Sequence, residues 1–298
     1  INVTEIENLL NLNETPDIND NITAYLLIGS DKRDNEDEDS YVDGDRADVI
    51  ILGFFNETIN KNALISIPRD TLVNNLCTGE VERINASYKK NNCGNGAENI
   101  VAAVNTLTGI KIQHIASFNF DGFETIIDSF NGIEICVDRT QREGFAFELQ
   151  EGCQKVNGST ALNWTRSRNT EVLIGQKIID ENGNDNSEWK KMDNVSDLSR
   201  VERQQYLVIQ LLSELENFSS FAELLQFIQA LEETFVVDEG LSVNKATNIL
   251  WDMRTIELDN ITKLTIPTSP YELNDGRQVL ILNGNFYDFA TESLLIDE

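Results

Sequence analysis

The stretch Tyr25-Leu26-Leu27-Ile28-Gly29 decides the fold class, because it is an uncharged, apolar run that stops at a glycine. Two more apolar runs follow it, VIILGFF at 49–55 and ALISI at 63–67. Short runs of this kind are typical of strands that are buried on both faces of a sheet. We therefore expect these three segments to form the centre of a buried sheet.

Outward from this centre the chain alternates between helix and strand patterns. Helical spacing recurs at 97–108, 122–130, 159–165, 197–217, 220–236 and 242–254, and strand patterns at 115–118 and 133–137. Two further strand patterns, at 264–266 and 279–282, are the expected closing strands of the sheet. Ser159 is the expected cap of its helix. The alternation predicts an α/β fold, a three-layer α-β-α sandwich around a mostly buried mixed sheet. We expect one domain over 1–298, with 1–22 as a lead-in and 169–196 as a loop insertion.

Composition excludes several classes of protein. The 298 residues carry 51 acidic and 23 basic side chains, a formal net charge of −28. No nucleic acid is an expected partner, because neutralising phosphates needs a basic surface. No apolar run is long enough to span a bilayer. Since residue 1 is isoleucine and no signal peptide is visible, we interpret the chain as a piece of a longer protein or a mature form.

Arginine is gathered in short clusters. The clustered members are Arg33, Arg46, Arg69, Arg83, Arg166, Arg168, Arg200 and Arg203. A guanidinium fork binds two oxygens of a carboxylate or phosphate at once. In an acidic chain this clustering favours one local anion site, and pairing with surface carboxylates is the alternative.

Acid–arginine pairs stand at the ends of the three central strands. Asp31 follows the first strand, Arg46 and Asp48 precede the second, and Arg69 and Asp70 follow the third. Ligands of open α/β sheets gather at the carboxyl ends of strands. Carboxylates also suit Mg²⁺, which prefers to share phosphate oxygens.

Two later segments add polar groups. Arg166 and Arg168 are two residues apart and point the same way if the segment is extended. In the long helix, Asp197, Arg200 and Gln204 share one face. Arg203 points elsewhere and is expected to be a solvent-exposed partner of Asp or Glu.

The face that carries Arg200 continues as an apolar stripe. Its members are Val201, Val208, Leu211 and Leu215. A stripe that is polar and then apolar could hold an anion at its mouth and an apolar chain below. The alternative is that the apolar half is simply core, which is the commoner use of such a pattern.

The cysteines and the one histidine limit the chemistry. Four cysteines allow three connectivities, and we favour two local disulfides, Cys77–Cys93 and Cys136–Cys153, with four buried free thiols as the alternative. Disulfides indicate an oxidising, extracytoplasmic compartment. Without a CxxC pair, a zinc site is not expected. We expect His114 to be structural, because no Ser or Cys partner motif lies near it.

Sequence motifs of other enzymes are missing. GxSxG, GxGxxG and the Walker pattern do not occur in the sequence. Glycoside hydrolysis by two carboxylates is compatible with the many acidic residues, but it would not explain the arginine clusters.

Seven segments together resemble the LytR-CpsA-Psr family, whose members are called LCP proteins. In chain order they are LLIGSDKR (26–33), RADVIIL (46–52), LISIPRDT (64–71), RINASY (83–88), FNFDGFETIIDSFNGIEICVD (118–138), VNGSTALNWTRSR (156–168) and DLSRVERQQ (197–205). The resemblance runs from about Tyr25 to at least Gln205. Two positions depart from the family pattern: Val49 replaces a Ser or Thr, and Arg83 replaces a Lys.

This resemblance implies an extracytoplasmic, membrane-anchored phosphotransferase at the cell surface, with the anchor before Ile1. Such enzymes move a glycopolymer from a polyprenyl-pyrophosphate carrier to peptidoglycan, or to a glycosylated surface protein in some actinobacteria. Mg²⁺ is the implied cofactor, and local disulfides are similar to the actinobacterial branch. The polyprenyl chain would lie in an apolar tunnel between sheet and helices.

The resemblance also implies roles for individual residues. Asp31 and Asp48 would hold the metal, and Asp197 and Gln204 would order the pyrophosphate clamp. The clamp itself would consist of Arg46, Arg69, Arg83, Arg166, Arg168 and Arg200. Among all of these, Arg69, Asp31 and Arg168 are the predicted catalytic residues, and the general base would be Asp31 or Asp70.

Two alternative functions stay open. The first is a polyprenyl-pyrophosphate hydrolase that uses water as the acceptor. The second is a non-catalytic binder of lipid-linked anions, which would gain nothing from the Asp31–Asp48 pair unless a metal lay between the two carboxylates.

Overall fold

A computed structural model of the chain describes residues 22–31, 46–56, 61–75, 79–88, 96–192, 197–238, 240–286 and 288–290. The chain divides into two compact units. The first unit comprises 1–120 and 219–298, and the second unit comprises 121–218. The single domain expected over 1–298 stays a prediction.

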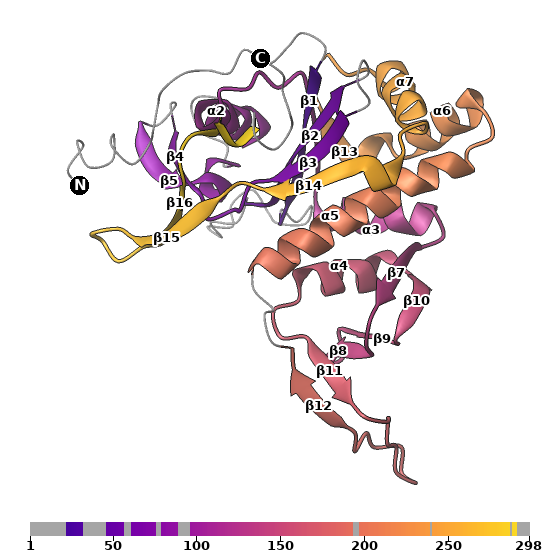
Figure 1. The fold of residues 1–298 in the computed structure, drawn as a ribbon. Coiled ribbons are helices and arrows are strands. Elements are labelled where there is room, and N and C mark those ends of the chain that lie inside the picture. The colour runs from indigo at the N-terminus through magenta and orange to yellow at the C-terminus, as the bar shows by residue number, and fades with distance from the viewer. Residues whose placement is uncertain are drawn as a thin grey trace, which may run out of the picture. The chain divides into compact units, whose positions relative to one another are not determined.

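A mixed six-stranded sheet is the centre of the first unit (Figure 1), in the order β13-β6-β1-β2-β3-β14. The strands are β1 (Ile22–Ser30), β2 (Ala47–Asn56), β3 (Lys61–Ser66), β6 (His114–Phe118), β13 (Phe235–Val237) and β14 (Ile261–Thr265). β1 is antiparallel to β2 and parallel to β6, while β3 is antiparallel to β2 and parallel to β14. The three apolar runs thus lie in adjacent strands, which confirms the α/β class with a central mixed sheet.

Helix α2 (Gly96–Thr108) covers one face of this sheet. Side chains alternate along the strands, so Leu26 and Ile28 of β1 and Leu52 of β2 point to the same side. There they pack with Ile100 and Val104 of α2 in a fully buried cluster. Burying each of these side chains stabilises the unit by about 1.5–3 kcal/mol relative to exposing it.

The opposite face of the sheet is also apolar. Tyr25 and Leu27 of β1 and Phe55 of β2 are half-buried on this side. The rings of Tyr25 and Phe55 meet edge to face, with their centroids 5.6 Å apart. Gly53 makes room for this pair, since a Cβ there would lie 3.0 Å from the Phe55 ring.

Elsewhere among its described residues, the first unit has two hairpins, two long helices, a short helical segment at 286 and 288–290, and 3-10 turns. The hairpins pair β4 (Leu72–Asn75) with β5 (Glu80–Arg83), and β15 (Thr268–Glu272) with β16 (Gln278–Leu282). The helices are α6 (Phe221–Ala230) and α7 (Val243–Met253), and the 3-10 turns are η1 (Ile84–Tyr88), η3 (Glu232–Thr234) and η4 (Leu258–Asn260).

Two expectations are wrong here. The helix expected over 220–236 stops at Ala230, because Phe235–Val237 pairs with β6 as an edge strand. The strand expected at 279–282 pairs with β15 and does not close the central sheet.

The second unit packs helices against small sheets. Its helical elements are α3 (Phe120–Ser129), α4 (Gly158–Arg166), α5 (Asp197–Glu214) and the 3-10 turn η2 (Leu215–Asn217). Its strands are β7 (Ile133–Val137), β8 (Gln141–Glu143), β9 (Phe147–Leu149), β10 (Gly152–Val156), β11 (Glu171–Ile174) and β12 (Glu188–Lys191). Antiparallel β7 and β10 form one sheet, and β12-β11-β8-β9 forms another. Helices α4 and α5 contact each other and β7.

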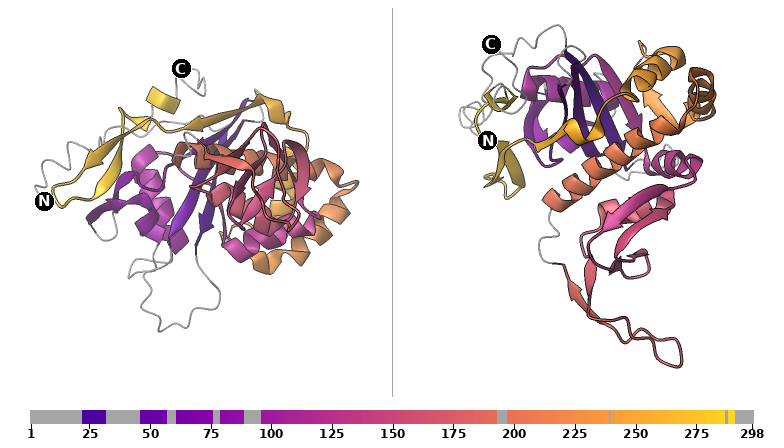
Figure 2. Two further views of the ribbon diagram at one scale, coloured as in Figure 1. Left: turned by 90° about the horizontal axis from the view of Figure 1, so that it is seen from below. Right: turned by 45° about the vertical axis from the view of Figure 1, so that its right-hand side comes forward.

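Two local expectations in the second unit are corrected. The expected loop over 169–196 contains the β11–β12 hairpin, which extends away from α4 (Figures 1 and 2). The cap of α4 is Asn157, whose side chain accepts from the Thr160 N–H at 3.0 Å, and Ser159 lies inside the helix. Within the part of the chain that the structure describes, no helix is long and apolar enough to cross a membrane.

Candidate active site

The antiparallel register of β1 and β2 brings Asp31 and Arg46 together. Ser30 lies opposite Ala47, so the residue that ends β1 faces the residue that begins β2. The Arg46 N–H donates to Oδ1 of Asp31 at 2.8 Å, and the Asp31 N–H donates to the Arg46 carbonyl at 3.1 Å. Backbone bonds therefore fix the Asp31 carboxylate at the end of the sheet.

Asp31 and Asp48 form a pair of neighbouring carboxylates. Burial raises the pKa of Asp31 above its usual range, the Arg46 N–H bond opposes that shift, and the negative charge of Asp48 adds to it. A cation between the two groups would relieve both the burial and the repulsion. Their oxygen donors fit Mg²⁺, which is commonly held by one or two carboxylates together with substrate phosphates.

Arg69 joins this pair from the end of β3. Its Nη1 donates to Oδ1 of Asp48 at 2.7 Å, and both side chains are partly buried. Nε of Arg69 lies 3.8 Å from Oδ2 of Asp70 and is buried without a hydrogen-bond partner among the described residues. A buried donor without an acceptor is costly, and an anion that reached this point would satisfy it.

Arg83 is held by protein acceptors. Its Nη1 lies 3.2 Å from Oδ1 of Asp70. Its Nε and Nη2 donate to the Gln278 carbonyl at the start of β16, at 3.0 and 2.6 Å. In this arrangement Arg83 ties the β4–β5 hairpin to β16, and a phosphate contact would need these bonds to be exchanged.

In the second unit, the end of α4 carries Arg166 and Arg168. Both side chains are exposed, whereas Ser167 between them is 3% exposed. Ser167, at φ −56° and ψ 134°, caps the C-terminal end of α4, so only the residues after Arg166 leave the helix. Exposure alternates over 166–168, and a common direction of the two arginines stays a prediction.

Arg203 overturns one expectation. It is 8% exposed and is no surface partner of a carboxylate. Its Nη1 donates to the Trp164 carbonyl at 2.8 Å and its Nη2 to Oγ1 of Thr170 at 3.2 Å. Burial lowers the pKa of its guanidinium, and the charge of Glu143 opposes that shift.

Helical angles alone could not reveal these partners of Arg203. They come from the end of α4 and from the residue that precedes β11. The sequence offered one signal of a buried arginine: Arg203 lies three residues after Arg200 on a helix that contacts α4.

The remaining residues of α5 are placed as follows. Arg200 and Gln204 are half-buried, whereas the side chain of Asp197 lies outside the described residues. Of the apolar stripe, Val201 and Leu215 are buried, and Val208 and Leu211 are half-buried.

The expected site residues thus fall into two local groups. Asp31, Arg46, Asp48, Arg69, Asp70 and Arg83 belong to the first unit, and Arg166, Arg168, Asp197, Arg200 and Gln204 belong to the second. In the first unit, contacts link Asp31 to Arg46, Asp48 to Arg69, and Asp70 to both Arg69 and Arg83. Their convergence on one diphosphate stays a prediction.

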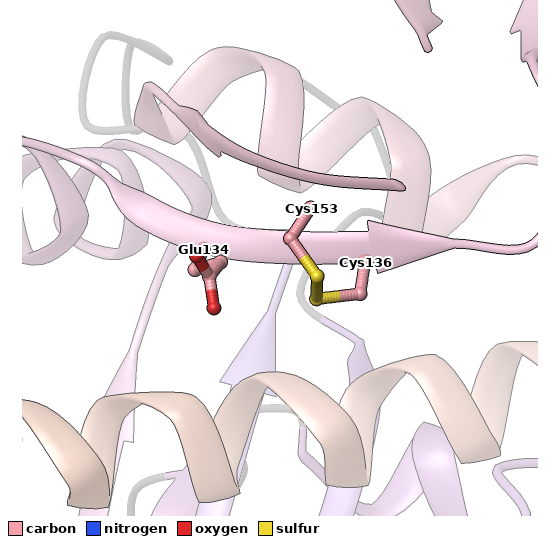
Figure 3. A group of neighbouring side chains, drawn as sticks. All are labelled: Glu134, Cys136 and Cys153. Atoms are coloured by element: carbon pink, nitrogen blue, oxygen red, sulfur yellow. A yellow bond between two sulfur atoms is a disulfide. The ribbon is translucent and has the colours of Figure 1, made fainter. Parts of the chain in front are cut away.

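The Cys136–Cys153 disulfide is confirmed. It joins directly paired residues of β7 and β10 (Figure 3). Glu134 lies beside it, but both sulfurs are consumed in the disulfide, so this group offers a metal only one carboxylate. The predicted partners Cys77 and Cys93 lie outside the described residues.

His114 opens β6 and pairs with Asp238, which follows β13. Its Nδ1 lies 3.2 Å from Oδ2 of Asp238, and the same oxygen accepts the Ile115 N–H at 3.1 Å. This contact fixes the end of one strand against the next, which agrees with the structural role expected of His114.

Comparison with known proteins gives one family. The model described as the LytR_cpsA_psr family matches residues 4–175 and 187–294. Among curated relatives, the cell wall biosynthesis protein LcpB of Corynebacterium glutamicum is 30% identical over 166 residues, which cover 53% of this chain and 39% of LcpB. The polyisoprenyl-teichoic acid–peptidoglycan teichoic acid transferase TagU of Bacillus licheniformis is 25% identical over 276 residues, which cover 92% of this chain and 74% of TagU.

Solved structures share the fold. The crystal structure of TagV from B. subtilis has a TM-score of 0.70 at 20% sequence identity, and the match covers 93% of this chain and 96% of that one. The chain spans well under half of LcpB and about three quarters of TagU.

Proposed function

Because this chain belongs to the LytR_cpsA_psr family, we propose that it is a phosphotransferase that moves a glycopolymer from a polyprenyl-pyrophosphate carrier to a cell-wall acceptor. The relative named as a teichoic acid transferase supports this class of reaction. The acceptor would be peptidoglycan or a glycosylated surface protein. The observation that carries the proposal is the Asp31–Asp48–Arg69 cluster at the end of the central sheet, where two carboxylates and an arginine with a spare donor face one another.

In the proposed reaction an acceptor hydroxyl attacks the phosphorus that bears the glycan. The new bond joins the acceptor oxygen to that phosphorus, and the bond to the bridging oxygen breaks, so that polyprenyl phosphate leaves. Negative charge moves to the leaving phosphate during this step, and preorganised donors stabilise it. Arg69 is oriented for that task, because Asp48 holds one end of its guanidinium and leaves Nε to donate.

A divalent cation, Mg²⁺ in our proposal, would be held by Asp31 and Asp48 and would supply positive charge to the diphosphate oxygens. Arg46 directly precedes β2 next to this pair and is exposed, so it can reach a bound phosphate. The second unit carries the exposed Arg166 and Arg168 and the half-buried Arg200 and Gln204, and we expect a phosphate to be their ligand.

The proton of the acceptor hydroxyl needs a base. Asp70 is engaged by Arg69 and by Arg83. Asp31 is the other candidate, and burial raises its pKa toward the range of a proton acceptor. We assign the base to Asp31 on these grounds.

The apolar second face of the sheet offers a place for the prenyl chain. Tyr25 and Leu27 share one face of β1, and Asp31 follows the end of this strand. A lipid along this face would have its phosphate end near Asp31. The strands approach closely at Gly29, where a Cβ would lie 3.0 Å from the Val49 side chain.

The proposed location is extracytoplasmic, at the cell surface and next to the membrane through an anchor outside this chain. The Cys136–Cys153 disulfide supports an oxidising compartment. The cell wall role named for LcpB and TagU agrees with this location.

The decisive experiment incubates the protein with a synthetic polyprenyl-pyrophosphate oligosaccharide and Mg²⁺, with and without peptidoglycan fragments. We expect polyprenyl phosphate to be released only with the acceptor and the oligosaccharide to become attached through phosphate. Equal release in both arms indicates the hydrolase alternative. Binding without release in either arm indicates the non-catalytic alternative, and both results contradict the proposal.

A further inference from the structure

We propose that Arg203 is a positioning residue, which holds the end of α4 and the following turn so that Arg166 and Arg168 face the same way. Its catalytic consequence rests on the proposed function above. Its structural content, that Arg203 orders the segment 165–170, does not.

The geometry is that of a clamp across the segment. Nη1 of Arg203 donates to the carbonyl of Trp164 in the last turn of α4, at 2.8 Å. Nη2 donates to Oγ1 of Thr170, at 3.2 Å. One planar guanidinium therefore bridges the two ends of the segment that carries both exposed arginines.

A second link closes the same segment from inside. Oγ of Ser167 and Oγ1 of Thr170 lie 2.6 Å apart, and both residues are buried. With Ser167 turned inward, its neighbours Arg166 and Arg168 are turned outward. Thr170 therefore contacts both Arg203 and Ser167, and it links Arg203 to the residue between the two exposed arginines.

The surroundings of Arg203 fit this task. Its Cζ lies 5.1 Å from the centroid of the Trp164 ring, which favours a cation. The Trp164 carbonyl also belongs to the C-terminal end of a helix, where the dipole favours positive charge. Arg203 is buried, which is costly for a charge, and its guanidinium donates to a backbone oxygen and a hydroxyl oxygen, while the charge of Glu143 favours its charged form.

Arg203 therefore differs from the arginines assigned to phosphate. Its two terminal nitrogens are occupied by Trp164 and Thr170, and its side chain is buried. A lysine at this position would keep the charge, but a single ammonium on a flexible stem lacks the planar fork that spans both acceptors.

The experiment compares Arg203→Lys and Thr170→Val with the unchanged protein and with Arg277→Lys. Arg277 is a matched control, because it is exposed and pairs with Asp275 two residues away. In the transfer assay we expect Arg203→Lys to lower kcat about 100-fold, with a smaller change in KM, because misplaced groups lose the transition state first. Thr170→Val should lower kcat in the same direction by a smaller factor.

Hydrogen exchange provides the second readout. We expect faster exchange of the backbone amides of 165–170 in both variants, with the β7 and β10 amides unchanged. Wild-type kcat in Arg203→Lys, or unchanged exchange over 165–170, would overturn the proposal. If the backbone amides of Arg203→Lys exchange faster throughout the protein, that variant is destabilised as a whole, and Thr170→Val becomes the deciding variant. A wild-type kcat in Thr170→Val would then refute the positioning role.

The failure of the proposed function is distinguishable. If the unchanged protein transfers nothing to any acceptor, the function falls, and the exchange rates of 165–170 still decide whether Arg203 orders the segment.

Discussion

At the scale of single residues, Asp48 links the groups that the first unit contributes. It accepts a hydrogen bond from Arg69 at 2.7 Å, and its charge also contributes to the raised pKa of Asp31. A carboxylate between an arginine and a second carboxylate can serve a cation on one side while it orients a donor on the other. Perturbed groups of this kind are common at functional sites.

Arg69→Ala tests the donor role. It removes the guanidinium that Asp48 orients, and with it the buried Nε that has no hydrogen-bond partner among the described residues. We expect polyprenyl phosphate release to fall by about 10²–10³-fold, the loss typical of one transition-state donor. Release is measured by chromatography of the lipid product. Arg277→Ala is the control, and equal activity of the two variants would contradict the assignment.

Asp31→Asn tests the metal site through stability. The fold raises the pKa of Asp31, so its ionised form is disfavoured in the folded protein. The neutral amide should therefore raise Tm slightly near pH 7 and abolish transfer. Addition of millimolar MgCl₂ should raise Tm of the unchanged protein, because binding to the native state stabilises it. A rise of the same size in Asp31→Asn would show that the cation binds elsewhere.

At the scale of elements, the register of β1, β2 and β3 assembles the first half of the site. Because β2 is antiparallel to both neighbours, its start lies beside the ends of β1 and β3. Asp31, Arg46 and Arg69 stand at those three positions. Their meeting at one edge therefore follows from the order and direction of the strands. The apolar runs predict the strands, and the acid–arginine pairs at their ends suggest the site, but the pairing direction is seen only in the structure.

Other parts of the fold could not be predicted, because their partners lie far along the chain. The helix expected over 220–236 reads Phe-Val-Val at its end, and the free edge of β6 converts those residues into β13. The hairpin within the polar segment 169–196 was not predicted. Its two strands, which contain Val172 and Trp189, are short and lie on either side of a long polar turn. The prediction that Arg203 is exposed was wrong, because helical angles give the direction in which a side chain leaves the helix. They do not say whether another element packs on that side.

The His114–Asp238 contact between β6 and the end of β13 predicts a pH effect. Burial raises the pKa of Asp238, but the Ile115 N–H and His114 outweigh it, so the folded-state pKa lies below the ordinary 3.8. A depressed carboxylate pKa contributes stability that is present above the unfolded-state pKa and is lost as the pH falls through the folded-state value.

We therefore expect Asp238→Asn to be less stable than the unchanged protein at about pH 6. At about pH 3 the two proteins should be closer in stability, because Asp238 loses its charge as the pH falls, whereas the amide of the variant is neutral at both pH values. Urea unfolding midpoints at the two pH values measure the difference. A gap that stays constant, or widens in acid, would show that the charge of Asp238 does not stabilise the fold.

At the scale of the whole molecule, the net charge of −28 sets the conditions under which a small arginine-rich site must work. Like charges repel one another in the folded chain and weaken it at low ionic strength. The arginines and carboxylates of the candidate site are held by short hydrogen bonds, such as the one from Arg69 to Asp48, and are screened less than distant surface charges.

Salt should accordingly stabilise this protein near neutral pH. The Debye length falls from about 30 Å at 0.01 M to about 8 Å at 0.15 M, which removes most of the long-range repulsion. We expect Tm to rise by several degrees over this range of NaCl, measured by differential scanning calorimetry. The control uses the same protein near its isoelectric point of about 4.2, where the net charge vanishes and the rise should vanish with it. A rise of equal size at both pH values would mean that salt acts mainly through water and apolar surface, because the net repulsion is absent where positive and negative charges balance.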